Sequence, residues 1–200
     1  MKTALRAGQG AMRLVTLADV AATPWKNGSG LTRDLLAWPD AADWQLRISV
    51  AEVARSGPFS AYPGVRRWFC VLQGAGVVLH FEGGPQTLTP DSPPLGFDGA
   101  AAPGCDLISG PTLDLNLMAR QDAGRADMAR AVLGMPWLSN APLRALFCLQ
   151  AAVLHVAGQA PLAVPACTLA FTEQAEGEAW QLTAPPTTAA WWLAFEPQAS

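Results

Sequence analysis

The sequence of 200 residues has few charges of either sign, only two histidines and no long apolar run. Its 13 basic and 16 acidic side chains are scattered rather than gathered into a stripe, which argues against a nucleic-acid partner. No apolar stretch reaches the roughly 20 residues that cross a bilayer, and the N-terminus lacks the basic and apolar segments of a secretory signal. We therefore expect a cytoplasmic protein without a membrane partner.

Potential metal ligands are equally sparse. The four cysteines are far apart and form no CxxC pair, so they offer no zinc site and are expected to be reduced, buried thiols. His80 and His155 are isolated from each other, whereas transition-metal sites in β-barrel enzymes commonly combine several histidines with a carboxylate. We expect no metal and no other cofactor.

Glycine and proline, in contrast, are abundant, with 18 and 17 residues that separate short apolar stretches. This punctuation is typical of the many short strands of an all-β sandwich or barrel. The best candidate for a helix is residues 124–133, where Ala, Arg and Met favour helix and Gly134 and Pro136 supply the stop. We expect this short helix to link two halves of the chain.

An internal repeat suggests what those halves are. Residues 78–83 (VLHFEG) return as 153–158 (VLHVAG), an offset of 153 − 78 = 75, and Pro90 matches Pro165 at the same offset. Chance recurrence of Gly, Leu and Pro is the alternative, because no single match is long. The preserved order of the matches favours duplication of one β unit.

Alternation of apolar and polar residues predicts strands with one packed face. In residues 44–50 every second residue is apolar, and in residues 113–118 the polar face carries Asp114 and Asn116. Such a face is usually solvated, but in a small barrel it can line the lumen and form a ligand site.

The duplication also predicts which half holds such a site. At the offset of 75, Asp114 corresponds to Ala189 and Asn116 to Trp191, so the second half lacks the polar face. We expect the ligand site in the first half. The apolar run 191–195 should be buried in the core or in an oligomer interface, as in a homodimer.

The segment 25–30 (WKNGSG) is the most distinctive short motif. Its small residues can present backbone N–H groups to an anion. A phosphate-binding loop is excluded because Lys26 precedes the glycines and residues 31–38 look extended rather than helical. Two interpretations stay open: a tight turn that places Trp25 in the core, or a binding loop. A serine-hydrolase site is excluded because no Gly-x-Ser-x-Gly motif is present.

Four spaced motifs occur in the first 120 residues. They are WxNGxGxTR at 25–33, RxSxA at 47–51, GPFSxxPGxxR at 57–67 and GPxxDxNxMxR at 110–120. In this order, and over roughly residues 12 to 120, they resemble the HutD/Ves family. A chain of this many spaced motifs is specific to the family, although no single motif is.

The resemblance implies an all-β bicupin made of two jelly-roll type β-barrel halves, with little helix. Residues 12–121 would form the N-terminal cupin half with the ligand pocket, 122–139 a linker with a short helix, and 140–197 a degenerate C-terminal cupin half. HutD-type members are associated with histidine-utilisation genes and Ves-type members with environmental stress. No reaction is established for the family as a whole.

By their positions in the motifs, eight side chains are expected around the family's pocket: Asn27, Thr32, Arg33, Arg47, Ser49, Arg67, Asp114 and Asn116. Trp25 or Phe59 would add an apolar wall. We expect a small-molecule-binding or regulatory protein whose ligand is a small polar or carboxylate metabolite, such as urocanate or a formylated or formimidoylated glutamate. Arg33 or Arg47 would clamp the carboxylate, because a planar guanidinium group suits it.

Two alternatives accompany this expectation, and no catalytic residue is assigned. One is a metal-free cupin enzyme, an isomerase or hydrolase of the same metabolite class, in which Asp114 or Glu52 acts as general base. The other is an interaction module whose apolar C-terminal strand pairs with a protein partner.

Overall fold

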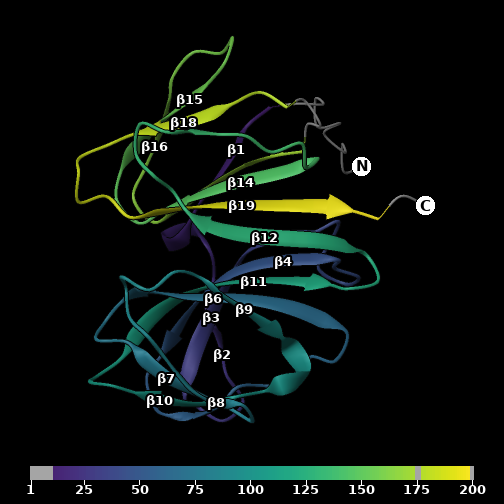
Figure 1. Cartoon of the computed structure of the whole chain (residues 1–200), viewed down its shortest axis with the longest axis vertical. Coiled ribbons are helices and arrows are strands. Elements are labelled where there is room, and N and C mark those ends of the chain that lie inside the picture. Colours follow the sequence, from purple (N-terminus) through teal and green to yellow (C-terminus); the bar gives the residue numbers. More distant parts are fainter. Residues whose placement is uncertain (1–10, 174–176, 199–200) are drawn as a thin grey trace, which may run out of the picture.

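The computed structural model describes residues 11–173 and 177–198, and β-strands dominate it. The chain forms two halves, one above the other in Figure 1, and each half is a sandwich of a large and a small antiparallel sheet. Two short 3₁₀ helices, Leu17–Asp19 (η1) and Gly99–Ala101 (η2), lie between strands. No helix in the described part of the chain is long and apolar enough to span a membrane.

The N-terminal half occupies the lower part of Figure 1. Its large sheet has the strand order β2 (Thr23–Pro24), β3 (Gly30–Trp38), β4 (Leu46–Val53), β11 (Thr112–Arg120), β6 (Val65–Gln73) and β9 (Leu95–Asp98). Its small sheet has the order β5 (Gly57–Pro58), β10 (Gly104–Leu107), β7 (Val77–Phe81) and β8 (Gly84–Leu88).

The C-terminal half lies above it. Its large sheet has the order β1 (Arg13–Thr16), β17 (Thr168–Thr172), β14 (Leu143–Cys148), β19 (Ala190–Pro197) and β12 (Gly124–Arg130). Its small sheet has the order β13 (Pro136–Trp137), β18 (Trp180–Thr183), β15 (Ala152–Val156) and β16 (Leu162–Val164). The strand β1 thus joins the sheet of the opposite half, at the edge next to β17.

The two halves repeat one strand order. The series β4-β11-β6-β9 corresponds to β12-β19-β14-β17, and β5-β10-β7-β8 corresponds to β13-β18-β15-β16. The same strand order in the large and small sheets of both halves confirms the predicted duplication and the all-β, jelly-roll type class. The large and small sheets of each half stay separate, so the expected closed barrels are instead two-sheet sandwiches.

The predicted helix at residues 124–133 is wrong. Residues Gly124–Arg130 form β12, which pairs with β19 along its length. Met128 is buried in the core while its neighbour Asp127 is exposed, which is the alternation of a strand. Packing of this face overrides the helical propensity of the Ala, Arg and Met residues. The segment expected to link the halves therefore supplies β12 and β13 to the C-terminal half.

The two large sheets pack against each other through their apolar faces. The shared core contains Leu115 and Leu117 from β11 and Leu193 from β19. Across the same interface, Trp68 Nε1 of β6 donates a hydrogen bond of 3.2 Å to the Ala126 carbonyl oxygen of β12. The opposite face of each large sheet consequently points into its own half.

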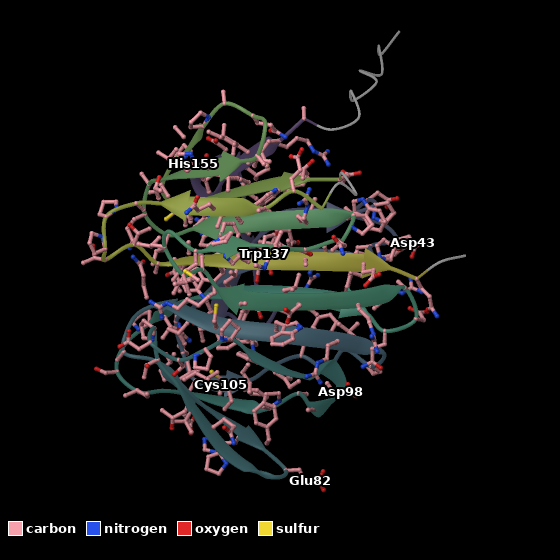
Figure 2. The ribbon with its side chains drawn as sticks, turned by 45° about the horizontal axis from the view of Figure 1, so that its top comes forward. Asp43, Glu82, Asp98, Cys105, Trp137 and His155 are labelled. Carbon is pink, nitrogen blue, oxygen red and sulfur yellow. The ribbon has the colours of Figure 1, made fainter. Side chains whose placement is uncertain are left out.

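Aromatic rings fill the interior of the C-terminal half. Trp192 of β19 stacks on Trp137 with ring centroids 5.0 Å apart, and both rings make edge contacts with Trp180. Figure 2 shows Trp137 in this half, far from Cys105 in the other half. Because β19 lies between β12 and β14, neither of its edges is open to pair with a partner strand.

The expected burial of the run 191–195 is confirmed, since Trp191, Trp192, Leu193 and Phe195 are each no more than 3% exposed. The predicted correspondence of Asn116 with Trp191 is off by one residue, however. Trp191 packs in the core shared by the halves, and Trp192 lies on the inner face. A shift of one residue moves every side chain of a strand to the other face.

Candidate ligand-binding site

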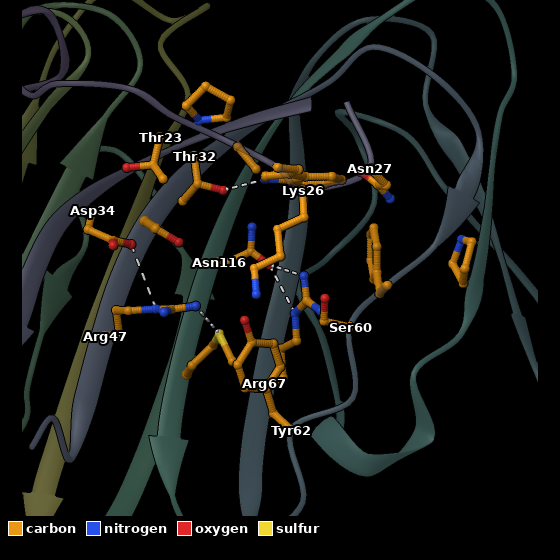
Figure 3. A pocket seen from close by; sticks show the side chains of 17 residues that line it. Thr23, Lys26, Asn27, Thr32, Asp34, Arg47, Ser60, Tyr62, Arg67 and Asn116 are labelled. Atoms are coloured by element: carbon orange, nitrogen blue, oxygen red, sulfur yellow. Dashed lines mark hydrogen bonds and ion pairs between the residues drawn. The ribbon is translucent and has the colours of Figure 1, made fainter. Parts of the chain in front are cut away.

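A pocket of about 540 Å³ opens into the interior of the N-terminal half (Figure 3). It lies between the inner face of the large sheet and the loop that follows β5. Its lining residues are Thr23, Pro24, Trp25, Lys26, Asn27, Thr32, Asp34, Arg47, Ser49, Ala51, Pro58, Phe59, Ser60, Tyr62, Arg67, Asn116 and Met118.

The turn between β2 and β3 forms the rim of this pocket. Asn27 Oδ1 accepts hydrogen bonds from the Ser29 backbone N–H (3.0 Å) and from Ser29 Oγ (2.6 Å), which fixes the turn. Gly28 has a φ of +67°, a conformation that glycine adopts without strain. A Cβ atom at Gly30 would lie 2.3 Å from the Glu52 carbonyl oxygen, so the close approach of β3 to β4 requires glycine there.

Trp25 and Lys26 project from this turn in different roles. The Trp25 ring packs against the small apolar core of the half, and its Nε1 donates to Thr32 Oγ1 at 2.7 Å. The Lys26 side chain extends into the pocket in Figure 3 and has no hydrogen-bond or ion-pair partner among the described residues. The motif therefore builds both a turn with a packed tryptophan and a wall of the pocket.

Arg67 of β6 is the most buried cation of the pocket lining, with 8% of its surface exposed. Its Nε and Nη2 both donate to Asn116 Oδ1, at 3.0 and 2.6 Å. The guanidinium group also lies 4.4 Å from the Phe59 ring centroid and 5.5 Å from that of Phe97. Burial lowers the pKa of Arg67 to about 10, so the side chain is still charged at neutral pH.

Arg47 of β4 lies nearer the surface, on the same face of the sheet. Its Nε is 3.7 Å from Asp34 Oδ1, and its Nη2 lies 3.3 Å from Met118 Sδ. The rings of Trp44 and Tyr62 flank the guanidinium group at 5.1 and 5.6 Å. The aromatic contacts and the long ion pair orient the arginine and leave donors available to a ligand.

Asp114 of β11 lies behind the pocket with none of its surface exposed. Its Oδ2 accepts a hydrogen bond of 2.8 Å from Thr112 Oγ1, and its Oδ1 has no hydrogen-bond partner among the residues that the structure describes. Burial raises the pKa of Asp114 to about 7, against the opposing effects of the Thr112 hydrogen bond and the Arg67 charge.

A family model described as HutD matches residues 17–192. The chain belongs to the HutD family. An uncharacterised 21.2 kDa protein in the hutC 3′ region of Pseudomonas putida is 34% identical over 111 residues, which cover 54% of this chain and 57% of that protein. Protein Ves of Citrobacter koseri is 35% identical over 104 residues, 51% and 54% of the two chains. The chain thus spans a little over half the length of these curated relatives.

A crystal structure of a conserved protein of unknown function from Pseudomonas aeruginosa PAO1 extends the similarity to the whole fold. It is 27% identical, has a TM-score of 0.84, and is matched over 94% of this chain and 100% of that chain. These findings confirm the resemblance that the spaced motifs predicted.

In this HutD-family chain, the structure brings most of the predicted site residues together. The lining includes Trp25, Asn27, Thr32, Arg47, Ser49, Arg67 and Asn116. It does not include Arg33, which follows the lining residue Thr32 and points to the other face of β3, or Asp114, which is covered completely. Of the two arginines predicted to clamp a carboxylate, Arg47 lies in the pocket.

Sequence reasoning did not assign several of the lining residues. Lys26 occupies an unspecified position of the WxNGxGxTR motif, although it is one of few basic residues in the segment. Asp34 and Met118 could have been found from the alternation of β3 and β11, because each lies two residues beyond a predicted site residue. Ser60 and Tyr62 follow β5 in a loop without periodicity, although Ser60 is a specified residue of the GPFSxxPGxxR motif.

The two histidines lie on the outer surface in matching strands, β7 and β15. His80 Nε2 is 2.8 Å from Asp106 Oδ2, and His155 Nε2 is 2.8 Å from Thr183 Oγ1. Within residues 11–173 and 177–198, no group of three or more His, Cys, Asp or Glu side chains is arranged to hold a metal ion. The lining residues of the pocket supply guanidinium, ammonium, amide and hydroxyl groups as hydrogen-bond donors.

Proposed function

We propose that this HutD-family protein binds a small carboxylate metabolite in the N-terminal pocket and acts as a binding or regulatory protein. The charge of the lining carries the proposal. Lys26, Arg47 and Arg67 face a cavity in which Asp34 is the one acidic residue of the lining set. A chain with a net charge of −3 thus concentrates positive charge in one enclosed place, which favours an anion.

The remaining groups suit a ligand that is polar at several positions. A volume of about 540 Å³ fits a small metabolite. Asn116 uses its Oδ1 for Arg67, so its amide N–H groups can donate to the ligand. Ser49 and Thr32 supply hydroxyl groups, and the Trp25 ring gives an apolar wall.

The relative in the hutC 3′ region supports a metabolite of histidine degradation, such as urocanate or a formylated or formimidoylated glutamate. A cytoplasmic location belongs to this proposal. Self-association into a homodimer is a separate expectation, which a mass measurement in solution checks. The enzymatic alternative has less support, because neither proposed base, Asp114 or Glu52, lines the pocket.

A thermal-shift screen tests the proposal with urocanate, formiminoglutamate, formylglutamate, histidine and formate. A ligand at about 100 times its Kd stabilises the native state by about 2.7 kcal/mol. We expect a shift with at least one carboxylate, lost in Arg47→Ala and kept in Arg120→Ala, which removes an exposed arginine paired with Asp43 and Asp122. A shift that survives Arg47→Ala would show that the site is assigned wrongly.

A further inference from the structure

Within residues 11–173 and 177–198, Asp114 is the one buried carboxyl group beside the pocket, and the contacts of the lining do not use it. Its Oδ1 is enclosed without a hydrogen-bond donor among the described residues, and its Oδ2 has the Thr112 hydroxyl alone. A buried carboxylate with an unpartnered oxygen is costly, whereas the protonated carboxyl group is tolerated in the same place. The protonation state of Asp114 therefore depends on the charges around it.

Asp114 and Asn116 share the inner face of β11, two positions apart, and Arg67 bonds to Asn116 rather than to Asp114. Arg67 is thus the cation that stabilises an Asp114 carboxylate, and the same cation is offered to a ligand from the pocket side. An external anion and the Asp114 carboxylate compete for one positive charge.

Two further ionisable groups, Cys105 on β10 and Arg47 on β4, lie in the same interior. Burial raises the pKa of the Cys105 thiol to about 12. Cys70 on β6 lies on the opposite face of the sheet, in the core shared by the two halves. Arg47 adds a second guanidinium group to this interior from β4. Asp114, with its pKa of about 7, changes its protonation state near neutral pH.

We propose that Asp114 couples the binding of a carboxylate ligand to the uptake of one proton. This inference rests on the proposed function of the pocket. When the ligand carboxylate binds beside Arg67, a proton from solvent joins an Asp114 carboxylate oxygen, and the protonated state is the one that holds the ligand. Asp114 acts as a positioning residue through Arg67 and Asn116, without touching the ligand.

The direction of the coupling follows from the charges. Before binding, burial holds the pKa of Asp114 at about 7. A ligand anion adds negative charge and occupies Arg67, so it raises this pKa further. Because binding and protonation are linked, the affinity for the carboxylate ligand falls as pH rises above neutrality. The fall is up to tenfold for each unit by which binding raises the pKa of Asp114.

Calorimetric titration with formylglutamate between about pH 6 and pH 8.5 tests this coupling, because the probe carries two carboxylates and no group that titrates in that range. For the wild type, we expect affinity to fall several-fold across the range and the heat to depend on the buffer, as proton uptake requires. Asp114→Asn should bind with nearly constant affinity, close to that of the wild type at the acidic end.

Asp34→Asn is the matched control, since it removes the carboxylate that lines the pocket. This variant should bind the ligand more tightly at every pH, and its affinity should depend on pH as that of the wild type does. The coupling would be overturned if the affinity of the wild type did not depend on pH, or if the pH dependence persisted in Asp114→Asn. Either result would still support binding in the pocket. If no carboxylate of the thermal-shift screen binds the wild type at any pH, the proposed function fails and the coupling fails with it. A folded Asp114→Asn protein is verified by its unfolding transition.

Discussion

On the inner face of β11 the N-terminal half carries Asp114 and Asn116, whereas on the inner face of β19 the C-terminal half carries Ala190 and Trp192. The strand order around both pairs is the same. One half keeps a pocket of about 540 Å³ lined with polar groups, and the other fills the equivalent space with indole rings. The comparison teaches that one strand order can hold either a polar pocket or a packed aromatic interior, depending on the side chains that the inner faces carry.

The buried arginines sharpen the contrast. Arg67 on β6 and Arg144 on the matching strand β14 both point inward and are 8% and 2% exposed. Arg67 faces the pocket, whereas Arg144 Nη1 donates to the Glu178 carbonyl oxygen at 2.9 Å and its guanidinium group lies 5.1 Å from the Trp180 ring centroid. The C-terminal half thus retains a buried cation that donates to a backbone carbonyl of the same half.

The largest effect is expected from Trp192→Ala in the filled half. Removing an indole ring that contacts both Trp137 and Trp180 leaves a cavity and should lower the free energy of unfolding by about 3–5 kcal/mol, measured by urea denaturation. Trp25→Ala at the pocket rim is the matched control, with an expected loss of about half as much because that ring is already partly exposed. Equal losses would break the comparison between a packed half and a binding half.

Asp114→Asn should change the pH dependence of stability. The native carboxyl group, with its pKa raised to about 7 from 3.8, binds a proton that the unfolded chain releases. Wild-type stability therefore falls as pH rises between these two values, and the variant lacks this fall. At pH 8 the variant should be more stable by on the order of 1–4 kcal/mol, and near pH 4 the difference should vanish.

Denaturation at a series of pH values measures this effect. Asp122→Asn, which neutralises an exposed carboxylate paired with Arg120, should leave the wild-type slope between pH 5 and pH 8 unchanged. An Asp114→Asn protein that follows the wild-type curve would mean that the buried carboxyl group does not titrate in this window.

Lys26→Gln should weaken binding of a carboxylate about three- to tenfold, since it removes an exposed charge that projects into the pocket. Titrations at low and high salt measure the effect, and the difference between wild type and variant should shrink as salt screens the lysine. Arg125→Gln on β12 removes a cation from the other half and should leave the affinity as it is. Equal losses in both variants would indicate a diffuse attraction rather than a pocket.

The smallest effects are expected on the outer faces. His80→Gln and His155→Gln alter matching positions of the two small sheets, where each imidazole makes one surface contact. Each should change the free energy of unfolding by less than about 0.5 kcal/mol and leave ligand affinity unaltered. If one of these two substitutions had a large effect and the other did not, the two halves would differ on their outer faces as well as in their interiors.

Much of this architecture could be predicted from the sequence because its signals are local. Alternation in β4 and β11, the repeat at an offset of 75 and the motif from Trp25 to Arg33 each depend on neighbouring residues. Seven of the nine predicted site residues lie in the lining for the same reason: motif residues on adjacent strands come together once the strands pair.

The errors arose where tertiary packing decides. Residues 124–130 have helical composition, but the core accepts Met128 only as part of a strand beside β19. The correspondence at Trp191 failed because a fixed offset ignores the irregular spacing between the strands of the two halves. Asp114 is polar and correctly placed on the inward face, yet the sequence gives no measure of how far behind the pocket a side chain lies.

The strand β1 has a consequence for how the protein is made. It pairs with β17, and the hydroxyl groups of Thr16 and Thr168 lie 3.2 Å apart although the residues are separated by 152 positions. During translation β1 leaves the ribosome early and must wait until β17 has been synthesised. Its edge of the sheet closes among the last events of folding, so nascent chains arrested before about residue 170 should carry an unpaired N-terminal strand.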